Sequence, residues 1–470
     1  MASDAKINID YDGTWEGAGK YNLITSSSST GSYSGTEANG LVKDNSIIDS
    51  VVKFDGTNLT LFADRTGGSS FNANDLYIET SQIGQDYSNG ASQALAGYAN
   101  EKKREGALAD IIRDLEYLEG GRVVSEAKKQ EMIKTQRLLT PTANGSNLQT
   151  SITASDLALS SINGRLGDVR RIGLSGFSPD YTGLSSGDTD IGYDSTLWMK
   201  AMGSKATQSS VARYDGYDTS TYGFVAGMDK TIDDDALYGI ALAYSTTKTN
   251  QDNLASDSSD TKSIQATAYA SKQFENAYVD GYLSYSQHKT DGTRTANSGK
   301  VTSSVKSDQI GAKVEAGYNI PLNDGISVTP FASVEYGLIN QKAYNEKGSK
   351  YQNDALKVDA VKLNKGTVAL GAKLTTNIEF DDVLITPEFK ASVYNSFGDN
   401  KSDIKAQFMG GGDKFVTPVQ ELNKTMYNVA MAVETKISDS TSLIFGVDYD
   451  RSKDGKFQAY SGNVTFGISF

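Results

Sequence analysis

A strict alternation of side-chain character over the last eleven residues constrains the fold of this chain more than any other feature. Small or polar residues separate the apolar ones, which are Tyr460, Val464, Phe466, Ile468 and Phe470. A period of two places these apolar side chains on one face of a β-strand. In lipid, only a closed sheet pairs every backbone group, so a transmembrane barrel needs such a strand up to its closing edge. The C-terminal strand therefore predicts a membrane-embedded β-barrel.

The composition excludes several classes of function. The chain has 470 residues, no cysteine and one histidine, His288. Disulfides and thiolate metal sites are therefore excluded, and we expect neither a metal nor another cofactor. The formal net charge of −13 argues against a nucleic-acid partner. A run of about 18 apolar residues is absent, so no helical membrane span is expected.

Period-two alternation continues from Ser195 to the C-terminus and predicts an all-β barrel domain over residues 190–470. We expect about twelve strands, at residues 195–208, 218–231, 236–249, 261–274, 277–290, 301–320, 326–340, 359–380, 383–396, 415–437, 441–451 and 455–470. Short turns alternate with longer polar joins near residues 209–217, 250–260, 290–300, 341–358 and 397–414. Tight periplasmic turns and long external loops are typical of outer-membrane barrels. The pattern thus predicts a 12-stranded antiparallel transmembrane β-barrel.

Charged residues on these strands indicate which face of the sheet lines the lumen. A charge in the middle of the bilayer costs roughly 2–4 kcal/mol, so charges on a membrane strand must point inwards. The same argument assigns a set of lumen-facing charges: Asp229, Asp280, Lys313, Glu315, Glu335, Lys373, Glu388, Lys390 and Asp448. Both signs occur, which suggests ion pairs across the lumen. A soluble sandwich is the alternative, but it does not need long strands with alternating loop lengths.

Residues 147–171 are predicted to form a helix. With a rise of about 1.5 Å per residue, this helix would be roughly 36 Å long and could cross a membrane. This segment is rich in Ser, Thr and Ala, which makes the helix slim but too polar for lipid. Its C-terminal part carries the charges Arg165, Asp168, Arg170 and Arg171. We predict that the helix plugs the pore, with its arginines near carboxylates such as Glu315, Glu335 or Glu388.

The chain before this helix divides into two further regions. Residues 1–90 contain short β-segments between Gly, Ser and Asn residues, with strands expected at 7–11, 21–26, 50–54, 59–63 and 75–79. Residues 91–146 form a helical connecting region. An apolar stripe runs from Leu108 to Leu118, and Pro141 ends a second, weaker helical segment.

Several motifs give the chain a family resemblance. Residues 138–144 (LLTPTAN) precede the helix, residues 162–170 (INGRLGDVR) lie near its end, and the barrel ends on Phe470. With these motifs, residues 120–470 resemble type Va autotransporters. The strand motifs look like those of rickettsial surface-antigen translocators of the outer membrane protein A and B type, and they are residues 222–229, 328–330, 342–346 and 386–388.

The resemblance implies a translocator that carries its linker helix in the pore and delivers an N-terminal passenger to the bacterial cell surface. It implies a monomeric, non-enzymatic barrel in outer-membrane lipid, assembled by periplasmic chaperones and the barrel-assembly machinery. The implied assembly signal is Val464, Phe466, Ile468 and Phe470. The passenger would be an adhesin-like surface antigen with a host-cell ligand. The alternatives are an outer-membrane channel or porin, which does not need the helix, and an enzyme with an esterase passenger.

Two further motifs concern the fate of the passenger. Residues 13–25 are similar to the autochaperone segment that ends β-helical passengers, or they are only β-turns of an unrelated domain. Some autotransporters cleave themselves at an Asn-Asn pair just before a stretch like residues 162–170. Here Ser160 and Ser161 take that place, and serine cannot attack the backbone as the Asn amide does. We expect an uncut linker, or a cut made elsewhere by another protease.

Overall fold

The computed structural model describes the chain in several stretches. These are residues 19–25, 48–54, 58–65, 89–102, 108 and 134–172, and residues 195–469 except 213, 233–234, 254–256, 324, 349–353, 377, 381–382, 400–401 and 439–440. None of the described helices has the length and apolar character needed to cross a membrane.

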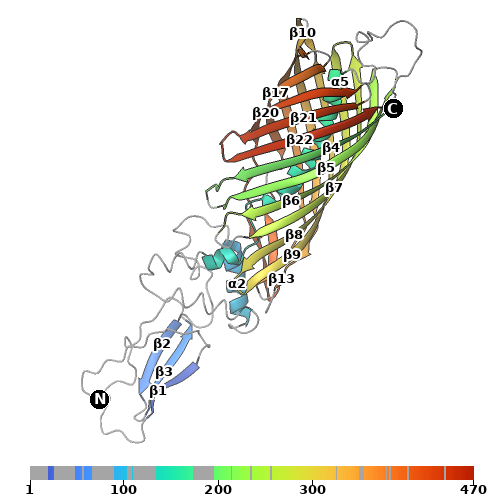
Figure 1. Ribbon diagram of the computed structural model, residues 1–470. Helices are drawn as coiled ribbons and strands as arrows, with labels where there is room; N and C mark the ends of the chain where they lie inside the picture. Colours follow the sequence, from blue (N-terminus) through green and yellow to red (C-terminus); the bar gives the residue numbers. More distant parts are fainter. Residues whose placement is uncertain are drawn as a thin grey trace, which may run out of the picture.

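Twelve long antiparallel strands close into a barrel (Figure 1). The ring closes where the last strand pairs with the first, from Phe457 opposite Gln208 to Ser469 opposite Thr196. The prediction of a 12-stranded antiparallel barrel is therefore confirmed. The strands are β4 (Ser195–Gln208), β5 (Tyr217–Ile232), β6 (Ala236–Gln251), β7 (Ser258–Phe274), β8 (Ala277–Ala296), β9 (Gly299–Tyr318), β11 (Ile326–Gln341), β15 (Val361–Thr376), β17 (Val383–Gly398), β20 (Thr425–Ser438), β21 (Thr441–Ser452) and β22 (Phe457–Ser469).

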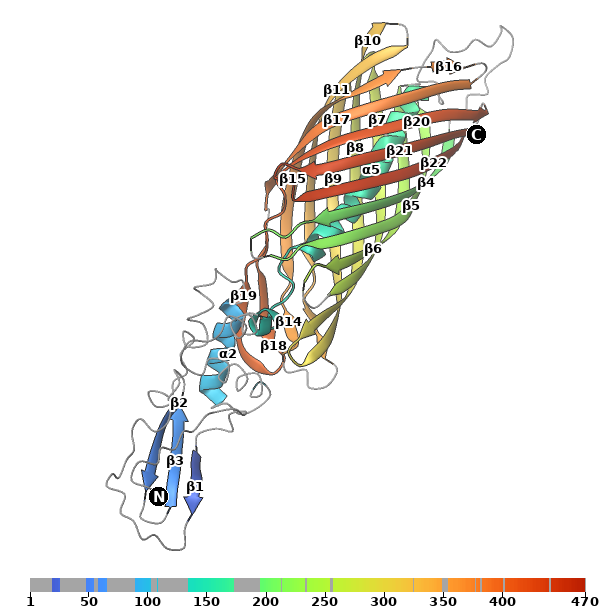
Figure 2. The ribbon, with the colours of Figure 1, turned by 60° about the vertical axis from the view of Figure 1, so that its left-hand side comes forward.

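The two ends of the barrel differ in their connections. At one end, which we call the short-turn end, residues 233–235 and 275–276 join neighbouring strands. The short strands β10 (Ile320–Asn323) and β16 (Ile378–Phe380) belong to this end, and so do the start of β4 and the end of β22 (Figures 1 and 2). At the opposite, long-join end, the connections after β11 and β17 are far longer.

Side chains alternate between the outside and the lumen along each strand. On β22, Val464, Phe466 and Ile468 are exposed on the outside, whereas Thr465 between them is buried. On β6 the exposed large apolar and aromatic side chains are Tyr238, Ile240, Leu242 and Tyr244. Equivalent residues on the neighbouring strands extend this exposed apolar band around the barrel. A band of this kind is the surface that lipid covers in a transmembrane barrel.

The hairpin between β8 and β9 corrects the prediction of a long join at residues 290–300. The two strands continue until Ala296 pairs with Gly299, which leaves a turn at residues 297–298. The polar sequence concealed an inward apolar layer, because Ala296 and Val301 pack against Ala355. Beyond the membrane a strand can be polar on its outer face, so composition alone does not separate it from a loop.

A small sheet beyond the barrel corrects the predicted loops at residues 341–358 and 397–414. Its order is β12-β14-β18-β19, and we call it the loop sheet. The predicted strand 415–437 is wrong as one element, because β19 ends at Thr417 and β20 begins at Thr425. The elements are β12 (Tyr344–Asn345), β14 (Leu356–Val358), β18 (Ile404–Phe408) and β19 (Gly411–Thr417), while β13 (Lys347–Gly348) pairs with β9.

Helix α2 (Asn89–Lys102) packs against β19 of the loop sheet (Figure 2). Leu95 and Tyr98 are buried in this contact region. A Cβ added at Gly90 would lie 2.4 Å from the carbonyl oxygen of Val416, so only glycine fits there. Gly412, with φ +85°, lies under the Tyr98 side chain. The segment before the pore helix is thus held on the long-join end of the barrel.

The N-terminal region contains a three-stranded sheet in the order β1-β3-β2. Its strands are β1 (Gly19–Thr25), β2 (Ile48–Phe54) and β3 (Asn58–Arg65), and they overlap three predicted strands. The strands predicted at 7–11 and 75–79 lie outside the described residues, as does most of the apolar stripe that begins at Leu108. The boundaries of the four predicted regions stay predictions.

Candidate functional site

Helix α5 (Ser146–Ile172) lies along the barrel lumen (Figures 1 and 2). It includes all of the predicted helix 147–171. At its N-terminal part, the Thr150 hydroxyl lies 3.1 Å from that of Thr249, near the long-join end of β6. At its C-terminal part, Arg170 reaches Asp280, near the short-turn end of β8. The chain therefore enters the lumen at the long-join end and leaves it at the short-turn end.

The residues before α5 tie its start to the barrel wall. The Ser146 backbone amide donates to Asn144 Oδ1 over 3.2 Å, and Gly145 takes a positive φ of 74°. Asn144 Nδ2 donates to Gln251 Oε1 over 2.6 Å and to the Asp215 carbonyl over 3.1 Å. One asparagine side chain thus joins the helix start to β6 and to the loop that follows β4.

Small side chains bring α5 close to the wall formed by β4 to β8. Ala154 and Ala158 are buried, and the Ser155 hydroxyl donates to Ser286 over 3.0 Å. The ring of His288, the single histidine, lies 3.5 Å from Ser155 and 2.8 Å from Ser263, and so belongs to the same polar lining. Apolar side chains complete the contact in one cluster that includes Leu159, Ile162, Leu166, Val169, Trp198, Val225 and Leu237.

Arg165 and Asp229 form a bidentate ion pair inside the lumen. Arg165 Nε lies 3.0 Å from Asp229 Oδ2, and its Nη2 lies 2.9 Å from Oδ1. The two side chains are only 1% and 2% exposed. Tyr269 donates to the same carboxylate over 3.0 Å and accepts from Trp198 Nε1 over 2.9 Å. This buried pair is therefore held by hydrogen bonds from the wall, as a desolvated pair requires.

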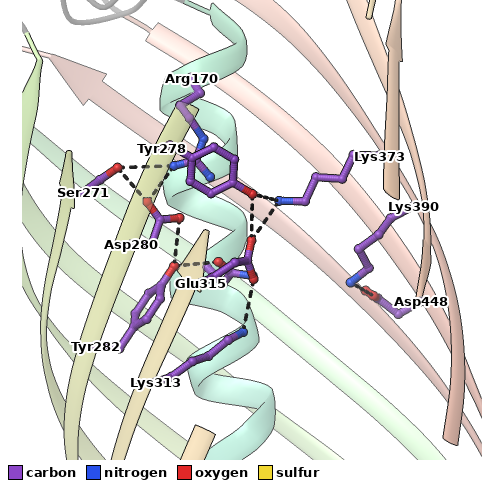
Figure 3. Close-up of polar contacts among 11 residues, drawn as sticks. Arg170, Ser271, Tyr278, Asp280, Tyr282, Lys313, Glu315, Lys373, Lys390 and Asp448 are labelled. Atoms are coloured by element: carbon purple, nitrogen blue, oxygen red, sulfur yellow. Dashed lines mark hydrogen bonds and ion pairs between the residues drawn. The ribbon is translucent and has the colours of Figure 1, made fainter. Parts of the chain in front are cut away.

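A second charged cluster surrounds the C-terminal part of α5 (Figure 3). Arg170 Nη1 lies 2.8 Å from Asp280 Oδ1, which also accepts from the Ser271 hydroxyl over 2.7 Å. The Arg170 guanidinium lies 3.7 Å from the centre of the Tyr278 ring. Both contacts favour a positive charge at this depth of the lumen, through ion pairing and through the π-face of the ring.

Glu315 is the centre of the same cluster (Figure 3). Its Oε1 lies 3.2 Å from Lys373 Nζ and accepts from Tyr278 over 3.0 Å. Its Oε2 lies 3.5 Å from Lys313 Nζ and accepts from Asn163 of α5 over 3.1 Å. Asn163 in turn accepts from Tyr282 over 2.6 Å. A neutral amide on the helix is thus connected to charges from β9 and β15.

The arginines of the helix have other partners than those expected. Arg165 pairs with Asp229 and Arg170 with Asp280, rather than with Glu315, Glu335 or Glu388. The reason is that the part of α5 with the arginines packs against β4 to β8, whereas Glu335 and Glu388 lie on β11 and β17. These two glutamates point inwards and are half-buried.

The other predicted site residues are placed as follows. Lys390 and Asp448 approach each other to 3.7 Å on the inner face of β17 and β21 (Figure 3). The side chains of Asp168 and Arg171, and all of Phe470, lie outside the described residues. Ser161, at the position of the self-cleaving pair, lies within α5, and its hydroxyl donates to the Leu157 carbonyl over 2.8 Å.

Several polar and aromatic residues of the helix and of the barrel wall were not predicted from the sequence. They are Asn163, Trp198, Tyr269, Tyr278 and Tyr282. Tyr278 and Tyr282 share the inward phase of Asp280 on β8, so the period-two argument that placed Asp280 could have found them. They were not predicted because only charged side chains were assigned to the lumen, and tyrosine, tryptophan and asparagine donors are uncharged.

An ion pair at the long-join end of the barrel holds the chain before α5. Arg294 of β8 contacts Glu346 through Nε at 2.9 Å and Nη2 at 2.6 Å, and its Nη1 donates to the Leu138 carbonyl over 2.6 Å. Burial alone would lower the pKa of Arg294, but the charge and hydrogen bond of Glu346, together with Asp354 and Tyr344, outweigh burial and raise it. Arg294 is therefore a permanent cation at the mouth of the lumen.

A family model and several rickettsial relatives match this chain. The family model of the autotransporter β-domain matches residues 197–450. Outer membrane protein A of Rickettsia conorii is 27% identical over 463 residues, which cover 91% of this chain and 21% of that protein. Outer membrane protein B of Rickettsia typhi is 24% identical over 300 residues, covering 61% and 18%. The chain thus spans about a fifth of the length of these relatives.

The solved translocator domain of the autotransporter NalP from Neisseria meningitidis has a TM-score of 0.48 at 16% identity, covering 67% of this chain and 99% of that one.

Proposed function

Because the chain belongs to the autotransporter β-domain family, we propose that it is the translocator of an outer-membrane autotransporter, which delivers and anchors an N-terminal passenger. The barrel lies in the bacterial outer membrane. Its role is one of transport and anchoring rather than catalysis, in keeping with the family and with the outer membrane proteins that it resembles.

The observation that carries the proposal is the path of α5 through the lumen (Figure 2). Strand β4 begins at the short-turn end, where Ser195 pairs with Lys230. The N-terminal end of α5 lies at the opposite end, beside Thr249 and Gln251. The chain before α5 is therefore on the other side of the membrane from the start of the barrel. This is the arrangement that a passenger exported through its own barrel requires.

The passenger is an adhesin-like surface antigen in this proposal, by analogy with the rickettsial outer membrane proteins, and binds a ligand on host cells. Periplasmic chaperones and the barrel-assembly machinery insert the barrel as a monomer into outer-membrane lipid. The assembly signal is the C-terminal strand, with Val464, Phe466 and Ile468 on its outer face and Phe470 at its end.

An open channel is the less favoured function. Helix α5 occupies the lumen, and its contacts with the wall are side-chain specific at both of its ends. A porin of this strand number would not need a helix held by two arginine–aspartate pairs. The conductance experiment described in the Discussion separates the two functions.

Surface display of the N-terminus tests the proposal. The chain is expressed in bacteria behind a signal peptide, with one epitope tag before residue 1. A matched variant carries the tag in the turn at residues 275–276, at the short-turn end. Antibody should label the first variant on intact cells and the second only after the outer membrane is permeabilised. An N-terminal tag that needs permeabilisation, in cells whose barrel is inserted, contradicts the translocator function.

A further inference from the structure

Four lysines form a row on the outside of the barrel, near its long-join end. Lys262 of β7 lies opposite Lys289 of β8, and Lys289 lies opposite Lys306 of β9. Lys342 follows the end of β11, and its backbone amide donates to the Lys306 carbonyl over 2.8 Å. All four side chains are exposed. We call these residues the lysine row.

The sheet holds these like charges next to one another, which is unfavourable unless an anion compensates them. Asp291 lies 3.0 Å from Lys289, and Asp308 lies 2.6 Å from Lys342. Among the residues that the structure describes, Lys262 and Lys306 have no ion-pair partner within 4.0 Å. Asp260 of β7, opposite Asp291, is exposed on the same face, so the four lysines outnumber the three neighbouring aspartates by one charge.

The row lies just beyond the exposed apolar band. On the same outer faces, the next apolar side chains towards the middle of the barrel are Ile264 on β7, Tyr285 on β8 and Ile310 on β9. They are two to four residues from the lysines, which is about 7–14 Å along a strand. This is the depth of lipid headgroups when the apolar band lies in hydrocarbon.

The outer face of the opposite wall differs at this end of the barrel in the strands that the structure describes. There the cross-strand neighbours on the outer face are Val393, Tyr427, Arg451 and Gln458, which carry one charge. Along the described strands of this wall, cross-strand neighbours on the outer face do not bring lysines together as β7, β8 and β9 do, and its exposed lysines Lys453 and Lys456 lie beyond the strand ends.

We propose that the lysine row binds the phosphate groups of lipid in the outer leaflet of the membrane. The inference rests on the proposed function, because that function places the long-join end at the cell surface. Lysine is a compact charge that binds phosphate as a point charge, and adjacent lysines at a membrane surface attract anionic headgroups. Backbone pairing places the four lysines side by side, so one side of the barrel is predicted to carry tightly bound phosphorylated lipid.

The test compares two double variants of the full-length protein. Lys262→Gln with Lys306→Gln removes the two charges without a partner in the row. The control, Lys205→Gln with Lys230→Gln, removes two exposed lysines of β4 and β5 outside the row. Native mass spectrometry in detergent measures the binding of bisphosphorylated lipid A. The row variant should bind it about tenfold more weakly than the unaltered protein, and the control about equally well.

Two further measurements make the outcome specific. The same lipid with its phosphates removed should bind weakly to every variant, and millimolar inorganic phosphate should not displace lipid A. Equal losses in both double variants, equal binding of the phosphate-free lipid, or displacement by free phosphate would each overturn the proposal. The N-terminal surface label should be unchanged in the row variant. Loss of this label in the unaltered chain would instead contradict the translocator function, so the two failures are distinguishable.

Discussion

At the level of single residues, the lumen is organised by charges that are taken out of water in pairs. Arg165 and Asp229 are almost fully buried, whereas Lys390 and Asp448 are about one-fifth exposed and 3.7 Å apart. A buried charge that loses its partner keeps its desolvation cost, so the penalty should depend on burial. Removing one charge from each pair therefore compares the cost of an unpaired charge at high and at low burial.

Replacing Asp229 by asparagine should lower the free energy of unfolding by about 3–5 kcal/mol, because Arg165 stays buried without a counter-charge. Asp448→Asn is the control and should cost about 1 kcal/mol or less. Denaturant unfolding in detergent micelles measures both. A second change, Arg165→Met, should recover part of the loss in the Asp229 variant. Equal effects of the two aspartate variants would contradict a special role of the buried pair.

The C-terminal aromatic residue is expected to matter more for assembly than for stability. Burial of one large apolar side chain contributes about 1.5–3 kcal/mol. Deletion of Phe470 should nevertheless slow insertion in cells strongly, because a recognition signal is lost. Pulse-labelling of inserted barrel in cells, compared with refolding of the same variant in detergent, separates the two effects. Insertion at the normal rate would refute the assembly signal.

At the level of elements, two helices connect the barrel with the chain that precedes it. Helix α5 fills the lumen through small residues and paired arginines, and α2 packs on the loop sheet beyond it. Both contacts use glycines or other small residues where backbones approach closely, as at Gly90 and Ala158. The contribution of each helix can be measured with a variant that affects that helix alone.

Deleting residues 147–171 while keeping the barrel should raise the single-channel conductance and lower the thermal stability. The lumen would lose the helix, and Asp229 and Asp280 would lose their guanidinium partners. Planar-bilayer recordings measure the conductance. Equal conductance with and without the segment would exclude a plug and would make the channel the better hypothesis.

Replacing Leu95 by aspartate should release α2 from the loop sheet, because Leu95 is fully buried and an unpaired carboxylate is costly there. Hydrogen exchange of the α2 amides should then become much faster, while exchange in the barrel strands stays unchanged. Gln93→Asp adds the same charge on the exposed side of α2 and is the control. Unchanged protection of α2 in the Leu95 variant would contradict the packing described here.

At the level of the whole molecule, stability comes from the closure of the ring. Every long strand has two neighbours, and the last pairs with the first along nearly its full length. A closed sheet has no edge from which detergent or denaturant can separate strands. The closed ring should therefore be detectable as resistance to detergent before heating.

The folded barrel should migrate differently in a denaturing gel before and after boiling, because the closed sheet resists detergent until it is heated. The measurement needs only unboiled and boiled samples of protein inserted in membranes. A truncated chain that lacks β22 cannot close the ring and should show a single mobility. Identical mobility of the boiled and unboiled full-length protein would argue against the closed barrel.

The long strands of the barrel and the face that each presents could be predicted from periodicity. The reason is local, because a shift of one residue would move every charge of a strand, such as Lys313 and Glu315, from the lumen into lipid. The slim polar helix could be predicted for a similar reason, since 147–171 is too polar for lipid and has the length to cross it.

The contacts between the helix, the barrel wall and the loop sheet could not be predicted in this way, because they depend on tertiary packing. The partners of Arg165 and Arg170 depend on the rotation of α5 and on the wall against which it packs, and side-chain period does not specify either. The same holds for the loop sheet and the contact of α2 with β19, where residues far apart in sequence meet. The lysine row also needs the register, because lysines on separate strands become neighbours only when the pairing aligns them. Periodicity is a property of one strand, whereas partners are a property of the packed barrel.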